Sequence, residues 1–131
     1  MRCKKIVIIV LCVVSAALLA GVVLMKFLNA KTPVVRDFEI SDYQYYLDNS
    51  PSSKTLGPIL NAEDAIKKAE KIWVEVYGLQ VKREKPYQVF FDAKNEIWLV
   101  TGSLRFYSAG GVANILIQRD TGSVLAIWHD K

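Results

Sequence analysis

Cysteine, histidine and, over its first part, acidic residues are scarce in this chain. Its 131 residues include two cysteines, Cys3 and Cys12, and one histidine, His129. Residues 31–131 contain no cysteine, which excludes an internal disulfide and a thiolate metal site there. One histidine does not supply the several ligands that zinc or copper needs, and no aspartate-rich loop typical of calcium sites occurs. We therefore expect no metal and no cofactor.

No aspartate or glutamate precedes Asp37. Four of the 17 basic residues stand at positions 2, 4, 5 and 26, which leaves 13 basic and 13 acidic residues from position 31 onward. The part after position 30 is therefore close to neutral, and the positive excess belongs to the N-terminal segment. This distribution does not indicate a nucleic-acid partner.

A long apolar run without a charged residue, IVIIVLCVVSAALLAGVVLM, occupies residues 6–25. A helix needs about 20 apolar residues to span a bilayer, whereas a cleaved signal peptide usually has about 7–15 and a small-x-small site. Leu28-Asn29-Ala30 meets that site pattern at one position only. The run favours a single-pass anchor in the inner (cytoplasmic) membrane, and the basic N-terminal flank predicts a C-terminal domain outside the cytoplasm. The alternative is a cleaved signal peptide and a secreted or periplasmic domain.

We divide the chain into a signal anchor or signal peptide (1–30), a tether and irregular segment (31–60) and a folded domain (61–131). Residues 31–60 are interrupted by helix and strand breakers, at Pro33, Asn49-Ser50-Pro51-Ser52-Ser53 and Gly57-Pro58. One short amphipathic turn is predicted between them, from Tyr43, Tyr45, Tyr46 and Leu47.

The clearest helix is predicted over Asn61–Tyr77, with Asn61 as N-cap and Gly78 as the residue that ends it. Its apolar residues follow the three-four spacing of one buried stripe: Ala62, Ala65, Ile66, Ala69, Ile72, Trp73 and Val76.

Four strands are predicted after the helix, over residues 87–92, 97–104, 112–119 and 123–129. Short connections between them indicate an antiparallel meander. One long helix packed on a curved antiparallel sheet of about four strands is an α+β architecture. Three glycine positions have structural interpretations: Gly102 as a bulge or a close backbone approach, Gly110-Gly111 as a tight bend or bulge at the strand entrance, and Gly122 as a hairpin turn.

Catalytic chemistry is not indicated. His129 is a candidate base, but no serine or threonine stands in a recognisable nucleophile turn. Gly110-Gly111 lacks the downstream Gly-Lys-Ser/Thr of a phosphate-binding loop. The sequence therefore predicts a protein that is not an enzyme.

A recognisable order of motifs runs through roughly Ala62–Lys131. The motifs are Ala69-Glu70-Lys71-Ile72-Trp73, Tyr77-Gly78, Lys85-Pro86-Tyr87, the strand from Ile97 to Leu104 with Trp98 and Gly102, Gly110-Gly111-Val112-Ala113, the hairpin Asp120–Leu125 and the terminal His129-Asp130-Lys131. This order resembles the immunity proteins with a nuclear-transport-factor-two-like fold, found in bacterial polymorphic toxin systems. The resemblance implies a cone-like α+β domain that binds and neutralises a cognate protein toxin, and it implies no catalytic residue. That fold has more N-terminal helix than residues 31–60 obviously provide.

Two alternatives remain open. The short helix, the strands and the hairpin Arg119–Leu125 are also similar to PepSY-type domains, which are extracytoplasmic and often inhibit or regulate proteases. A small-ligand pocket of the same broad fold would need converging polar groups, for which the sequence offers Asn114, Gln118 and His129.

If the chain neutralises a toxin by occlusion, its interface should be anchored by large aromatic and arginine side chains. Arg105, Phe106 and Tyr107 stand before the double glycine and are the first candidates, although strand-end packing would also explain the two aromatics. Asn114 and Gln118 are further candidates on the following strand.

Overall fold

The computed structural model of this chain describes residues 2–28, 32–105 and 109–131. The chain divides into two compact units, Met1–Thr32 and Pro33–Lys131. The first unit is the helix α1 (Arg2–Leu28), whose 27 residues give it a length of about 40 Å. Within it, Lys4–Val22 is long and apolar enough to cross a membrane, and an N-terminal signal sequence has the same properties.

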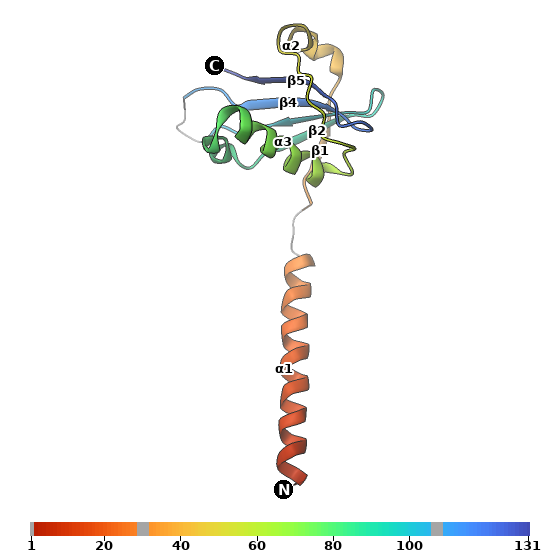
Figure 1. The fold of residues 1–131 in the computed structure, drawn as a ribbon, viewed down its shortest axis with the longest axis vertical. Helices are drawn as coiled ribbons and strands as arrows, with labels where there is room; N and C mark the ends of the chain where they lie inside the picture. The colour runs from red at the N-terminus through yellow and green to blue at the C-terminus, as the bar shows by residue number, and fades with distance from the viewer. Residues whose placement is uncertain (1, 29–31, 106–108) are drawn as a thin grey trace. The chain divides into compact units, whose positions relative to one another are not determined.

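The second unit is a mixed α+β domain (Figure 1). Its elements, in chain order, are β1 (Val35–Asp37), the 3-10 helix η1 (Ile40–Tyr43), α2 (Gln44–Asn49), α3 (Ala62–Tyr77), the 3-10 helix η2 (Leu79–Glu84), β2 (Gln88–Asp92), β3 (Ile97–Thr101), β4 (Ala113–Gln118) and β5 (Val124–His129). The predicted long helix is confirmed as α3.

One five-stranded sheet, in the order β1-β2-β3-β4-β5, forms the centre of the domain. Strands β2 to β5 make the predicted antiparallel meander. The prediction of about four strands missed β1, which pairs in parallel with β2 and places Val35 opposite Val89. All three β1 residues are exposed. A half-buried strand is recognised in a sequence by its alternating apolar and polar residues, and β1, which has no buried face, lacks this alternation.

Helix α3 covers one face of the sheet. The Asn61 side chain caps its first turn by accepting a hydrogen bond from the Asp64 N–H at 2.9 Å. Most of the predicted stripe lies against strand residues such as Val100 and Ile115. Five of its residues are buried, Ile66 is partly buried, and the prediction was wrong for Val76, which is 45% exposed near the end of the helix. Trp73 is fully buried and its indole N–H donates to the Asn114 carbonyl at 3.4 Å. This face is the larger of the two hydrophobic cores.

The opposite face of the sheet is covered by η1 and α2, so that α2 and α3 lie on opposite sides of it (Figure 1). This second core contains Ile97, Leu99, Leu116, Ala126 and Trp128, with Phe38, Ile40, Tyr43, Tyr46 and Leu47 packed against them. The Tyr46 ring stacks on Trp128 at a centroid distance of 4.0 Å. Much of the segment expected to be irregular thus contributes a layer of the domain.

Residues 50–59 run along the outer edge of β5. The N–H groups of Ile127 and Val124 donate to the carbonyls of Ser50 and Lys54 at 3.1 and 2.9 Å. At Gly122, where φ is +68°, a Cβ atom would overlap the backbone of Gly57. Only glycine fits both this conformation and this contact. The edge of β5 is therefore covered by the chain's own backbone.

Candidate functional site

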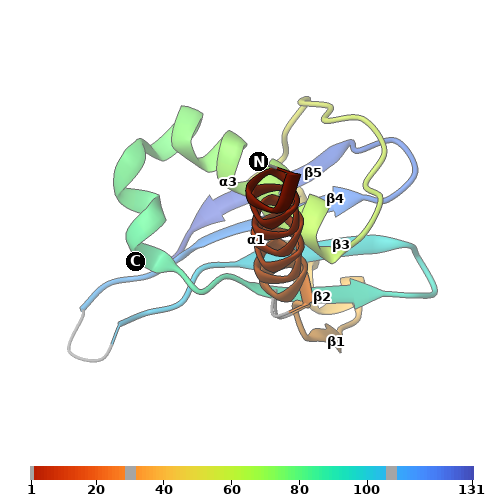
Figure 2. The same ribbon diagram turned by 90° about the horizontal axis from the view of Figure 1, so that it is seen from below.

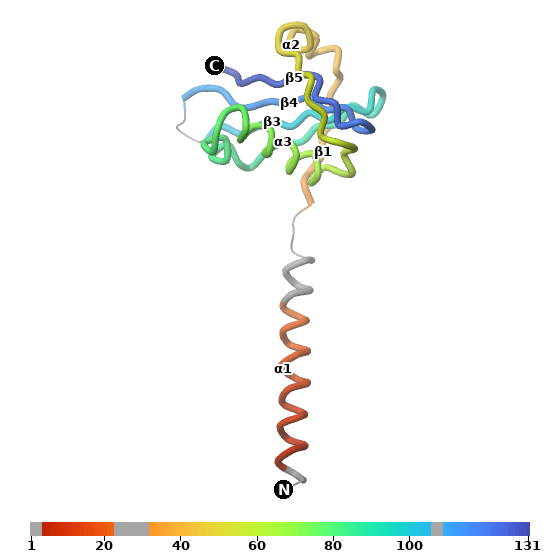
Figure 3. Tube along the Cα trace, viewed as in Figure 1, coloured from red at the N-terminus to blue at the C-terminus, as the bar shows by residue number. Residues whose placement is uncertain are grey.

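The two ends of the sheet are built differently. Short turns join β2 to β3 and β4 to β5 at one end, while the long β3–β4 connection, the C-terminus and the end of α3 lie at the other (Figures 1, 2 and 3). We call the second end the loop end. Long loops on a rigid scaffold are where proteins commonly place binding residues, so the loop end is the candidate site.

Glu84, at the end of η2, holds both sides of the β3–β4 connection. Its Oε2 atom accepts a hydrogen bond from the Ala113 N–H at 2.9 Å, and its backbone carbonyl accepts one from Ser103 N–H at 2.7 Å. The side chain packs so closely on Gly102 that a Cβ atom there would overlap the Glu84 carboxylate. The absence of a side chain at Gly102 is what lets Glu84 reach β4.

His129, the last residue of β5, contacts the second carboxylate oxygen of Glu84. Its Nε2 lies 2.8 Å from Glu84 Oε1 and its Nδ1 lies 2.8 Å from the Asp130 carbonyl oxygen. Both neighbours are acceptors, and only the protonated imidazolium donates from both ring nitrogens. Burial lowers the pKa of His129, but the hydrogen bond to Glu84, the Asp130 carbonyl and the nearby negative charges outweigh it and raise the pKa above its ordinary value.

The neighbouring residue, Asp130, accepts hydrogen bonds from side chains of β4 and β5. Its two carboxylate oxygens accept hydrogen bonds from Trp128 Nε1 at 3.1 Å and Asn114 Nδ2 at 3.0 Å. Its backbone lies so close to Gly111 that a Cβ atom there would overlap it. Glu84, His129 and Asp130 thus hold the ends of the β3–β4 connection from both faces of the sheet.

An open pocket of about 320 Å³ lies beside this arrangement, lined by Arg83, Glu84, Ser103, Leu104, Arg105 and nearby backbone. Arg105, an expected contact residue, is exposed at this pocket. The other two expected anchors, Phe106 and Tyr107, lie outside the described residues. The loop end therefore combines a rigid base with an exposed guanidinium, an arrangement suited to contacting another molecule.

A family comparison identifies the domain. The sequence pattern of the family Imm-NTF2-2, described as NTF2 fold immunity protein, matches residues 64–131, which is just over half of the chain. The chain belongs to this family. No curated protein and no solved structure matches the chain. The resemblance to immunity proteins is confirmed, and the matched region runs from α3 through β5 and contains the whole loop end.

The other predicted contact residues of this immunity protein do not converge with Arg105. Asn114 is 5% exposed, and its amide donates to Asp130 and to the Val112 carbonyl. Gln118 lies at the opposite end of β4, with its amide 3.4 Å from the carbonyls of Asn95 and Glu96. His129 contacts Tyr77 on the α3 face, whereas Asn114 bonds to Asp130 beside Trp128. The polar groups suggested for a ligand pocket are therefore spread over both ends and both faces of the sheet.

Trp98 and the remaining glycine hold structural positions in the immunity protein. Trp98 is 8% exposed and its ring lies 4.5 Å from that of Phe91 in the α3 core. Among the described residues, its indole N–H is the one buried side-chain polar group with no hydrogen-bond partner. Gly110 has φ of +118° and faces open space at the loop end.

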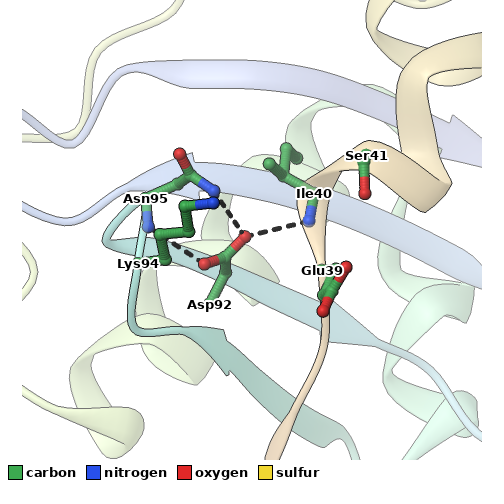
Figure 4. Close-up of a pocket in the computed structure, with 6 residues that line it drawn as sticks. All are labelled: Glu39, Ile40, Ser41, Asp92, Lys94 and Asn95. Carbon is green, nitrogen blue, oxygen red and sulfur yellow. Dashed lines mark hydrogen bonds between the residues drawn. The ribbon is translucent and has the colours of Figure 1, made fainter.

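A second pocket, of about 190 Å³, lies at the turn between β2 and β3 (Figure 4). Its centre is Asp92, whose carboxylate accepts hydrogen bonds from the Ile40 N–H and from the backbone and side chain of Asn95, at 2.9 to 3.0 Å. These hydrogen bonds, that from the Asn95 side chain first, lower the pKa of Asp92. Asp92 and Ile40 lie far apart in the chain, and no sequence motif links them. The hydrogen bond between them therefore could not be predicted from the sequence.

The carboxylate of Asp92 in this pocket is engaged by hydrogen bonds within the domain. Asp92 uses its oxygens to hold η1 against the sheet, and no group of three or more His, Cys, Asp or Glu residues suited to a metal ion occurs within the described part of the chain. The pocket marks the place where η1 is fastened to the sheet.

Proposed function

We propose that this chain is a binding protein, with no enzymatic activity, that neutralises a cognate protein toxin by covering its active region. The observation that carries the proposal is the match of residues 64–131 to the NTF2 fold immunity proteins. The geometry is consistent with it, because the polar groups that come together at the loop end, those of Glu84, His129 and Asp130, are used in contacts within the domain itself. His129, for example, has both ring nitrogens engaged by acceptors and none free to act as a base.

We propose that the site of encounter is the membrane. Helix α1 has the length and composition of a spanning helix, and the basic residues Arg2, Lys4 and Lys5 at its start favour an N-terminus that stays inside the cytoplasm. The domain would then meet the toxin in the periplasm or at the cell exterior. Cleavage after α1 would give an exported domain that meets the toxin in the same compartment.

We further propose that the loop end contributes to the interface through Arg105 and the adjoining Phe106 and Tyr107. Glu84 and His129 fix the base of this loop in the described structure, and a fixed base lowers the entropy lost on binding. Arginine and aromatic side chains dominate the energetics of many interfaces.

The test is purification of the tagged full-length chain from detergent-solubilised native cells, with an unrelated single-pass protein carrying the same tag as control. We expect a large secreted toxin, or its C-terminal fragment, to be recovered in stoichiometric amount with this chain only. Expression of that toxin in a susceptible strain should kill cells that lack the chain and spare cells that carry it. Recovery of a protease without such protection would overturn the proposal and favour a PepSY-like role.

A further inference from the structure

The segment that carries η1 and α2 differs in charge from the rest of the domain. Residues 37–53 contain four acidic residues, Asp37, Glu39, Asp42 and Asp48, and no lysine or arginine. All four side chains are exposed. Asp42, Tyr45 and Asp48 follow one another at intervals of three along η1 and α2, a spacing that places side chains on one side of a helix.

The charges of these acids lack partners in the part of the chain that the structure describes. Among the described residues, none of the four has an ion-pair partner, and Asp48 accepts one hydrogen bond from the neutral Gln44 amide. Lys94 shares a pocket with Glu39 without pairing to it.

The acids of the other elements contrast with them. Those with a salt bridge to a lysine, arginine or histidine are Asp64, Glu70, Glu75, Glu84, Glu96 and Asp120. Asp92 and Asp130 accept hydrogen bonds from their surroundings. Over the described ranges, Glu63 is the one acid of these elements with neither kind of contact, and it lies in the first turn of α3, where the helix dipole favours an acid.

A fixed aromatic side chain stands in the middle of the acidic surface. Tyr45 is 69% exposed, and its ring packs edge-on against Tyr46 at a centroid distance of 5.4 Å. Tyr46 in turn stacks on Trp128, whose indole N–H is held by Asp130. This column of rings runs from the second core to the surface. A tyrosine held in this way can be covered by a partner with little further loss of rotamer freedom.

We propose that the acidic α2 face, made by Glu39, Asp42, Tyr45 and Asp48, docks against a basic surface of the toxin. Tyr45 is the central anchor, and the carboxylates around it attract and orient the positively charged partner. A net negative surface of this kind raises the association rate with a basic protein by about 10- to 1,000-fold over that of a neutral surface. The inference rests on the proposed function and adds to it the docking face and the charge of the partner.

The probe for the test is the toxin recovered with the wild-type full-length chain in the experiment above. Binding kinetics are compared for three detergent-solubilised chains: the wild type, the double variant Asp42→Asn/Asp48→Asn, and a control, Glu63→Gln/Glu75→Gln, with the same change in net charge on α3. We expect the α2 variant to bind about tenfold more weakly, chiefly through slower association, and the control to bind like the wild type. Tyr45→Ala should weaken binding by about tenfold or more through faster dissociation, whereas Leu60→Ala, an exposed leucine just before α3, should not.

The dependence of the association rate on ionic strength is a second test. Raising the ionic strength from about 0.1 M to about 1 M shortens the Debye length from about 10 Å to about 3 Å, so the wild-type association rate should fall and the α2 variant should respond less. Equal binding by the α2 variant and the control, or a recovered toxin whose docked surface is acidic, overturns the inference and leaves the immunity function standing. Failure of the wild-type chain to bind or protect against any toxin overturns both.

Discussion

The two faces of the sheet are covered in different ways. On one face a single helix of 16 residues, α3, carries a regular apolar stripe and its own capping residues. On the other, η1 and α2 contribute 4 and 6 residues and depend on aromatic stacking and on Asp92 to stay in place. Helices as short as α2 are not stable by themselves, so this second layer exists because the sheet beneath it exists. The α3 face holds the larger core, and the α2 layer depends on its contacts with the sheet.

The largest change in the free energy of unfolding is expected when Trp73 is removed from the α3 face. Trp73→Ala deletes a fully buried indole and leaves a cavity, which should lower the free energy of unfolding by about 3–5 kcal/mol. A loss of that size is a large part of the stability of a small domain. Denaturant unfolding of the full-length chain in detergent measures it, with the exposed Lys71→Ala as control. A loss no larger than that of Tyr46→Ala would contradict the ranking of the two faces.

A smaller and more local effect is expected for Tyr46→Ala on the α2 face. The substitution removes the ring that stacks on Trp128 and should cost about 1–3 kcal/mol. Because η1 and α2 depend on this contact, hydrogen exchange should speed up over residues 38–50 while α3 stays protected. Tyr45→Ala, at the exposed end of the same column, should change stability by less than about 0.5 kcal/mol. Equal acceleration in α3 would show that the two layers unfold together.

Lowering the pH should destabilise the packing of η1 and α2 on the sheet. The folded-state pKa of Asp92 is lowered, so the stability it contributes is present above the ordinary aspartate value of 3.8 and is lost as the pH falls through the folded value. The near-ultraviolet circular dichroism of the Tyr46–Trp128 stack should decrease in that range. Asp92→Asn should remove this acid step, and Glu63→Gln should retain it. An unchanged step in Asp92→Asn would assign it to other carboxylates.

The smallest expected effect has the opposite sign and belongs to the loop end. The folded-state pKa of His129 is raised, so its contribution to stability is fully present below the ordinary value of 6.5 and is lost as the pH rises through the folded value. The ring is more than a third exposed, so solvent screening keeps the contribution small. Imidazole titration by NMR should give a value above 6.5 in the wild type and a lower one in Glu84→Gln. Equal values would mean that Glu84 does not hold the proton.

The sequence predicted α3 and the strands β2 to β5 better than it predicted β1 and η2. Helix α3 was placed within one residue because its stripe, its N-cap and Gly78 all act locally. The strands β2 to β5 were found from their period, although the predicted β3 extended three residues too far, to Leu104. Strand β1 has three exposed residues and no pattern, and η2 was not anticipated. The family was recognised from motifs within residues 62–131, where the match also lies.

The contacts that fix the loop end and the contact that holds η1 against the sheet could not be predicted from the sequence, because they join residues far apart in the chain. Glu84 meets His129 across 45 positions, and Asp92 meets Ile40 across 52. Glu84 stood in a mixed-charge stretch, and nothing in its neighbours marks it as a partner of the terminal histidine. Gly102 was the one residue whose type indicated a close approach, and it did not indicate that Glu84 is the residue that approaches. The approach of Asp130 to Gly111 was not predicted, because the double glycine was interpreted as a tight bend or bulge.

The backbone that runs along β5 has a practical consequence for anyone who shortens the chain. A fragment cut to the region matched by the family would begin at residue 64 and lose residues 50–59, whose carbonyls accept from Val124 and Ile127. The uncovered strand would offer its amide groups to other molecules, and such fragments join edge to edge into aggregates. A soluble fragment should therefore begin at Pro33, and the covering segment acts as a built-in guard against self-association.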